Sequence, residues 1–169
     1  MKKLLTTVIL IFSVNHAWAD TDYWADTMPT TLTPQQAFTI LTDSDQKSPA
    51  TQYLFRVSVL NKKNKIDDSE SNRTYWLVSE PLIFFKFNVL AYQTTPIDQK
   101  VECCTSRSNS FIMTPSNGTD LKGLRDFAAT NQCTIPDGKV IDDIPEKVAS
   151  KLTEQYKTKN FFELTCVLP

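Results

Sequence analysis

Apolar and polar residues alternate along the chain with two different periods, and the period predicts where strands and helices lie. From Gln52 to Leu60, and again from Phe161 to Leu168, every second residue is apolar, which is typical of a strand with one buried face. Leu82–Tyr92 is the most apolar stretch after the first twenty residues, so it must be central or covered in a sheet. The pattern predicts strands over 52–60, 73–79, 82–92, 101–106, 110–114 and 161–168.

Three other stretches carry the spacing and end signals of helices. Thr33 followed by Pro34 and Gln36 forms a capping box, which predicts a short helix that ends in the polar stretch before Pro49. A second apolar stripe runs from about Leu121 to Thr130, after a cap at Thr119 or Asp120. A third helix starts between Asp143 and Glu146, and its apolar residues recur every four positions at 144, 148, 152 and 156.

The order of these elements predicts the fold class. Runs of strands and runs of helices replace the regular alternation that builds a parallel sheet, so we expect an α+β fold. Its antiparallel sheet has about four to six strands, accompanied by two or three helices and fixed by disulfides. The hydrophilic stretch Asn61–Asn72 joins two of the strands as a long hairpin tip.

The start of the chain has the pattern of a secretory leader. Basic Lys2 and Lys3 precede the apolar run Leu4–Val14, and Ala17-Trp18-Ala19 is the small-residue pattern that signal peptidase cuts. We therefore expect residues 1–19 to be removed and 20–169 to form a single exported domain. Residues 20–31 are a polar lead, either a loose tail or an arm held by its aromatic rings. The apolar run is too short to serve as a transmembrane anchor.

Composition excludes several kinds of chemistry. The only histidine, His16, lies in the leader, so the exported chain lacks the usual general base and the commonest metal ligand. Three glycines are too few and too scattered for a phosphate-binding loop. Loss of Lys2 and Lys3 from 18 basic residues leaves 16 against 19 acidic ones, which gives no reason to expect nucleic acid. We expect no cofactor, no metal and no catalytic residue.

Four cysteines survive removal of the leader, and export places them where disulfides persist. Zinc is the rival, but adjacent Cys103 and Cys104 lack the spacing of a zinc knuckle. Neighbouring side chains of an extended segment point to opposite faces, so each of these two cysteines is expected to reach a different element. The prediction pairs one of them with Cys133 and the other with Cys166, without deciding which.

Two groups of carboxylates are catalytic candidates. Asp67, Asp68 and Glu70 lie close together, and Asp142 and Asp143 are adjacent. Such groups acquire split pKa values only when they are buried and brought together in a cleft. A solvated loop and a helix cap are the expected roles, and a cleft lined by Asp67, Glu70 or Asp143 is the observation that favours a carboxylate-dependent hydrolase.

The hairpin tip is the expected recognition element, because long polar loops on a rigid sheet often carry binding residues. Aromatic residues beside the tip strengthen this interpretation if their rings are exposed, although one of two neighbours in a strand must face the core. The candidate partner-binding residues are Lys62, Lys63, Lys65, Asp67, Asp68, Glu70, Tyr75 and Trp76.

One motif near the end of the chain resembles a known family. The segment Cys133-Thr134-Ile135-Pro136-Asp137-Gly138 precedes an amphipathic helix, Phe162 and a near-terminal Cys166. This arrangement resembles the tail of small periplasmic immunity proteins that neutralise peptidoglycan amidases delivered by type VI secretion. The resemblance covers only the region from Cys133 onward and transfers no functional residue. It implies a bacterial protein that binds a toxin.

These observations lead to three functional hypotheses. The first is a non-enzymatic protein-binding module, periplasmic or extracellular, of the inhibitor or immunity kind, with another protein as its partner. The second is a structural or assembly component of the cell envelope or a surface appendage, with Leu82–Tyr92 as the assembly strand. The third is the carboxylate-dependent hydrolase.

Overall fold

A computed structural model describes residues 31–95, 107–136, 144–157 and 160–168. All the strands in these ranges belong to one antiparallel sheet with the order β1-β2-β3-β4-β6-β5. The elements are α1 (Pro34–Leu41), α2 (Pro49–Arg56), the 3-10 helix η2 (Lys62–Asn64), β1 (Lys65–Asp68), β2 (Arg73–Phe84), β3 (Phe87–Thr94), β4 (Ser108–Pro115), α3 (Leu121–Thr130), β5 (Cys133–Thr134), α4 (Glu146–Tyr156) and β6 (Phe162–Val167). The α+β class and the antiparallel sheet are thus as predicted.

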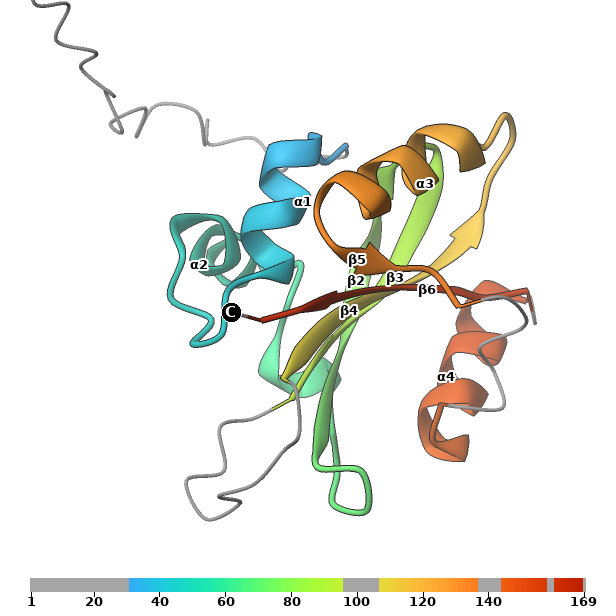
Figure 1. Ribbon diagram of the computed structural model, residues 1–169. Helices are drawn as coiled ribbons and strands as arrows, with labels where there is room; N and C mark the ends of the chain where they lie inside the picture. Colours follow the sequence, from blue (N-terminus) through green and yellow to red (C-terminus); the bar gives the residue numbers. More distant parts are fainter. Residues whose placement is uncertain (1–30, 96–106, 137–143, 158–159, 169) are drawn as a thin grey trace, which may run out of the picture.

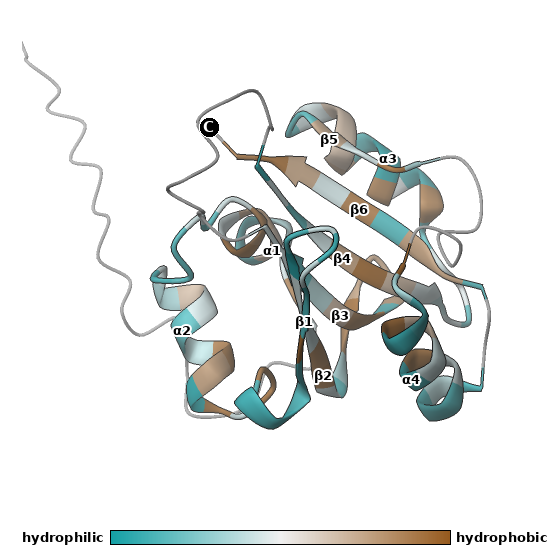
Figure 2. Ribbon diagram, turned by 90° about the horizontal axis from the view of Figure 1, so that it is seen from below, coloured by the Kyte–Doolittle hydropathy of each residue, from teal (hydrophilic) through white to brown (hydrophobic). Residues whose placement is uncertain are grey.

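The sheet is covered on both faces by helices. On one face, α1, α2 and α3 pack over a core that includes Trp76, Tyr92 and Phe111 from successive strands. On the other face, α4 covers Leu77, Ala91 and Ile112, among others. Figure 1 shows α3 and α4 on opposite sides of the strands, and Figure 2 shows the strands running between α4 and the pair α1 and α2.

The most apolar segment lies inside the sheet. Phe84 and Phe87 are paired at the end of the β2–β3 hairpin, and both are buried. Phe85 and Lys86 form the connecting turn with positive φ angles of 48° and 59°, as a tight hairpin requires. Strand β3 is paired with β2 and with β4, so most of Leu82–Tyr92 is central, as predicted, and is not an edge strand free for assembly. The single strand predicted over 82–92 is wrong, because the turn at Phe85 and Lys86 divides the segment between the end of β2 and the start of β3.

All three predicted helices are present, and α1 and α3 have side-chain caps at the predicted positions, whereas Pro145 precedes α4 without a side-chain cap. Thr33 and Gln36 make the reciprocal hydrogen bonds of a capping box at the start of α1. Asp120 caps α3, where its carboxylate accepts a hydrogen bond of 2.8 Å from the amide of Gly123. The period-four stripe of α4 faces the sheet, with Val148 and Leu152 fully buried.

The strand predicted over Gln52–Leu60 is wrong, because Pro49–Arg56 forms helix α2. Ser48 caps this helix by accepting a hydrogen bond from the amide of Thr51, and Pro49 occupies its first turn. The side chains at 50, 53 and 54 are buried, which is helical spacing. The apolar alternation is real in the sequence, but the helix start signal in front of it decides the local structure.

The long hairpin tip predicted over Asn61–Asn72 is also wrong in its extent. Its first part forms η2, its middle forms the edge strand β1, and only the turn from Ser69 to Asn72 joins β1 to β2. Lys65–Asp68 pairs with Arg73–Trp76 in a regular antiparallel register. The side chain of Ile66 is buried while those of Lys65 and Asp67 are exposed, so this polar segment has the alternation of an edge strand. Its pairing with β2 leaves a shorter loop than predicted.

The predicted disulfide pairing is wrong: Cys133 is bonded to Cys166, so neither is available to Cys103 or Cys104. The last strand, β6, inserts between β4 and β5, which makes Cys133 and Cys166 direct cross-strand partners 4.2 Å apart at Cα. Such proximity follows from antiparallel pairing and not from the spacing of cysteines along the chain. Cys103 and Cys104 lie outside the described residues.

Several further predictions fall on residues that the structure does not describe. These are the leader, most of the arm over 20–31, the strand over 101–106, and Asp142 with Asp143. Among the helices that are described, none combines the length and apolar character needed to cross a membrane.

Candidate functional site

A polar groove of about 470 Å³ lies between α4 and the segment that leads into β1. We call it the α4 groove. It joins the first residues of the predicted recognition element to a helix far along the chain. Its lining residues are Asn64, Leu77, Lys151, Glu154, Gln155 and Lys157.

Helix α4 forms one wall of the groove. Lys151, Glu154 and Gln155 follow each other at helical spacing, so they share one exposed stripe. The adjacent stripe of the helix, with Val148 and Leu152, is buried against the sheet and fixes the direction in which the polar residues point. Lys157 ends the helix in the left-handed conformation, with φ of 53°.

The end of this helix is attached to β2 by a tyrosine. The hydroxyl of Tyr156 donates a hydrogen bond to the carbonyl of Val78, and Gln155 donates one of 3.0 Å to the same hydroxyl. Burial raises the pKa of Tyr156, so the phenol keeps its proton at neutral pH. The α4 wall is therefore held at its C-terminal end as well as by its apolar stripe.

The opposite wall is fixed by hydrogen bonds to the same strand. Asn61 caps η2 by accepting a hydrogen bond from the amide of Lys63. The side-chain amide of Asn64 donates a hydrogen bond of 3.1 Å to the hydroxyl of Ser79. Ser79 in turn donates to the carbonyl of Ser58 and bonds through its amide to Val59. Leu77, which is 5% exposed, forms an apolar floor between the two walls.

Cations dominate the surroundings of the groove. Lys151 and Lys157 line it, and Lys62 and Lys63 directly precede Asn64 and are exposed. The ion pairs within the described ranges involve three other lysines, at positions 47, 65 and 122. Glu154 lies in the groove and Glu80 follows Ser79, so lysines outnumber the carboxylates.

The other charged candidates of the predicted tip lie away from the groove. Lys65 forms an ion pair of 2.8 Å with Asp67 and lies over the ring of Trp76, on the α2 side of the sheet. The hydrogen bond from Lys65, with a second one from the Thr74 hydroxyl, lowers the pKa of Asp67. The side chain of Ser71 lowers the pKa of Asp68 in the same way. Glu70 is exposed in the turn.

The two aromatic candidates are both buried, so neither ring offers a surface for a partner. Tyr75 is 2% exposed and packs on the α4 side of the sheet, while Trp76 is 7% exposed and packs on the other face. Neighbouring strand residues point in opposite directions, and here both faces are covered. The condition that both rings be exposed is therefore not met.

The carboxylates of the tip do not form an acid–base pair. Asp67 is exposed and its pKa is lowered, whereas a general acid at neutral pH needs a raised one. None of Asp67, Asp68 and Glu70 lines the α4 groove or the second hollow described below. Within the described ranges, no three His, Cys, Asp or Glu side chains gather as a metal-binding group.

A second hollow, of about 350 Å³, lies on the opposite face, between α3 and the β5–β6 edge. Apart from Arg125, which is exposed, its lining residues are of apolar types, and it adjoins the disulfide through Cys133. Pro136, at the end of a described range, forms part of its rim.

Comparison with known proteins adds no assignment: no family model, curated protein or solved structure matches this chain.

None of the predicted partner-binding residues lines the groove, although Lys62 and Lys63 directly precede Asn64 in the chain. The walls depend on Asn64, Lys151, Gln155 and Lys157, which the sequence pattern did not indicate. The polar stripe of α4 was the signal that could have indicated them, because it repeats with the same spacing as the buried one. Its pairing with Asn64 exists only in the folded chain.

Proposed function

We propose that this protein is an exported, non-enzymatic binding module that holds another protein in the α4 groove, as an inhibitor or immunity protein does. The observation that carries this proposal is the groove itself. Two walls from distant parts of the chain are each tied to β2, and they present lysines and amides above an apolar floor. A small number of fixed polar groups around a desolvated centre is the usual anatomy of a protein interface.

Several sequence features support the same proposal. The leader pattern, the single histidine in the leader and the lack of a catalytic motif favour an exported protein that acts by binding. The Cys133–Cys166 bond suits a protein that works outside the reducing cytosol. The resemblance of the C-terminal region to immunity proteins suggests a toxin or secreted hydrolase as the partner.

Site-specific photocrosslinking tests this proposal. Gln155, which lines the groove, is replaced by p-benzoylphenylalanine in the full chain, expressed with its leader in its own host. The matched control carries the same amino acid at Lys122, which is exposed on α3, across the sheet. We expect one protein to be crosslinked at position 155 and not at 122.

The captured partner is then purified and mixed with the unmodified protein. A one-to-one complex that lowers a hydrolytic or toxic activity of the partner supports the inhibitor role. Crosslinks that are absent, or identical at positions 155 and 122, overturn the proposal that the α4 groove binds a protein.

A further inference from the structure

The lysines of the α4 groove point to the chemistry of its occupant. We infer that the segment bound there is an acidic stretch of polypeptide whose carboxylates pair with Lys151 and Lys157. This inference rests on the proposed function and specifies its partner. Both lysines are exposed and line the groove, and within the described ranges neither forms an ion pair.

Charge complementarity is the main argument. Lys62 and Lys63 precede Asn64 along η2 and are exposed, so they add positive charge near this wall although they do not line the groove. Potentials of opposite sign across an interface steer association and select the partner. An acidic segment is the occupant that these four lysines favour.

The rest of the lining fits an extended peptide better than a free anion. Leu77 offers an apolar contact at the floor, and the amides of Asn64 and Gln155 each keep a carbonyl oxygen that can accept a hydrogen bond from a peptide N–H. Glu154 lies on the helix between Lys151 and Lys157, so it separates two positions at which a carboxylate is favourable. The site therefore suits spaced carboxylates with an apolar side chain between them.

The same features disfavour two other polyanions. A nucleic acid presents a continuous row of phosphates, which Glu154 and Glu80 repel, and the chain has a formal net charge of −1. Binding to an anionic membrane is usually reinforced by exposed apolar side chains. In the described part of the chain the only large hydrophobic residue that is exposed is Val167, on β6 and outside the groove.

A peptide titration tests the inference with the purified exported chain. The probe is an amidated octapeptide of alternating Glu and Leu, and its control has Gln in place of every Glu. Binding is followed by NMR shifts of the backbone amides of Asn64 and Leu77 and by calorimetry at low salt. We expect the acidic peptide to bind about tenfold more tightly than the neutral one, and its affinity to fall as salt rises.

Charge reversal locates the binding. The double variant K151E/K157E is expected to weaken the affinity for the acidic peptide by about tenfold or more. The matched double variant K86E/R107E changes the same net charge at exposed sites outside the groove, and it is expected to stay within about twofold. All four positions are exposed, so we expect both variants to remain folded, and thermal unfolding checks this.

The other outcomes are informative as well. Equal binding of the neutral peptide, equal weakening by both double variants, or tighter binding to anionic phospholipid vesicles or to an oligonucleotide overturns the acidic-peptide inference. If the photoreactive residue at position 155 crosslinks a protein whose complex is insensitive to K151E/K157E, this inference fails while the proposed function stands. If the peptide binds in the groove but no protein is crosslinked, the proposed function fails.

Discussion

The hydroxyl of Tyr156, in the last turn of α4, donates a hydrogen bond to the backbone carbonyl of Val78 in β2 over a distance of 3.3 Å. The bond connects the helix wall of the α4 groove to the same strand that anchors the opposite wall through Ser79. The half-buried phenol of Tyr156 therefore holds the helix wall at this end of the groove, in addition to the apolar stripe of α4.

Replacement of Tyr156 by Phe is expected to lower the free energy of unfolding by about 1 kcal/mol, because the carbonyl of Val78 loses its side-chain donor. Urea unfolding at pH 7 measures the change. Amide hydrogen exchange is expected to increase in the last turn of α4 and to stay the same in α3. Unchanged exchange in α4 contradicts the anchoring role.

The ionisation of the buried tyrosines gives the fold an alkaline limit. Burial raises the pKa of Tyr75, Tyr92 and Tyr156 above the ordinary value of 10.0, so the folded state retains these protons more strongly than the unfolded chain. Their contribution to stability is complete below pH 10 and is lost as the pH rises through the folded-state values. Denaturant unfolding between pH 8 and pH 11.5 is expected to show this decline. The slope is expected to be smaller in the Tyr92→Phe variant, because that variant lacks one of the three phenols, whereas lysine ionisation affects both proteins equally.

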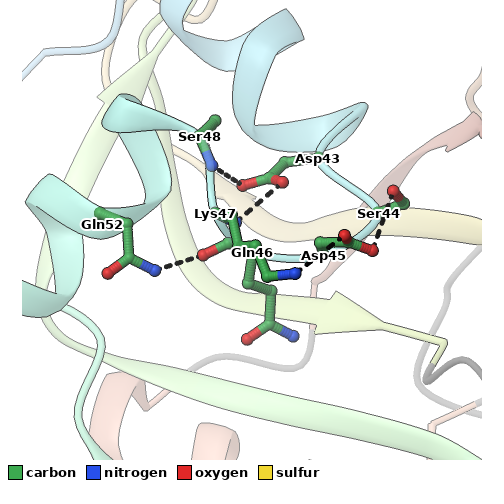
Figure 3. A network of polar contacts seen from close by, with 7 residues as sticks. All are labelled: Asp43, Ser44, Asp45, Gln46, Lys47, Ser48 and Gln52. Atoms are coloured by element: carbon green, nitrogen blue, oxygen red, sulfur yellow. Dashed lines mark hydrogen bonds and ion pairs between the residues drawn. The ribbon is translucent and has the colours of Figure 1, made fainter.

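Acid also lowers the stability of the fold, through Asp43 in the loop between α1 and α2 (Figure 3). Burial by itself raises the pKa of this carboxyl, but hydrogen bonds from the Thr51 hydroxyl, Ser48 and the Lys47 amide outweigh it and lower the pKa. A lowered folded-state pKa supplies stability above the unfolded value of 3.8, and that stability is lost as the pH falls through the folded value.

The variant Asp43→Ala is expected to lose about 1 to 2 kcal/mol at pH 7 and to lose less further stability than the wild type on acidification. The matched control is Asp45→Asn, which removes an exposed ion pair with Lys47 in the same loop and is expected to cost less than about 0.5 kcal/mol. Equal losses in the two variants contradict the assignment of Asp43 as the organising residue of the loop.

The disulfide is expected to add about 3 to 4 kcal/mol to the free energy of unfolding, because it closes a loop between residues 33 positions apart and so lowers the entropy of the unfolded chain. The double variant Cys133→Ser with Cys166→Ser tests the magnitude by denaturant unfolding. Peptide mapping without reduction tests the pairing directly, and a peptide that links Cys133 or Cys166 to Cys103 or Cys104 contradicts it.

Gly123 is expected to resist substitution although it lies within a helix. A Cβ atom at this position comes within 2.9 Å of the Phe85 ring and closer still to the Asp120 carboxylate that caps α3. Gly→Ala in a helix usually adds about 1 kcal/mol of stability, but here the crowding is expected to reverse the sign and cost about 1 kcal/mol. The neighbouring exposed change Lys122→Ala is the control, with an effect below about 0.5 kcal/mol. A more stable Gly123→Ala variant contradicts the packing argument.

Local signals in the sequence predicted much of the fold, and non-local ones account for the errors. The bounds of α3 follow from a cap and an apolar stripe within a dozen residues, and the structure has the predicted range Leu121–Thr130. The prediction over Gln52–Leu60 is wrong because aromatic and β-branched residues, which favour strands, occupy every second position there. The Ser48-Pro49 start signal favours a helix, and the structure follows that signal.

The disulfide and the α4 groove could not be derived in this way. Cys133 meets Cys166 because β6 inserts beside β5, and Asn64 meets Lys151 because α4 folds back over the sheet. Both relationships depend on strand order, which the spacing of residues along the chain does not encode.

Within the described residues, the sheet ends on one side in β1 and on the other in β5. Strand β1 is four residues long and carries charged side chains at positions 65, 67 and 68, and β5 is two residues long. A guest strand that docks by main-chain hydrogen bonds finds only a short ladder at either margin. If the protein binds a partner as proposed, selectivity therefore depends on side chains and can be altered one substitution at a time without disturbing the strand register.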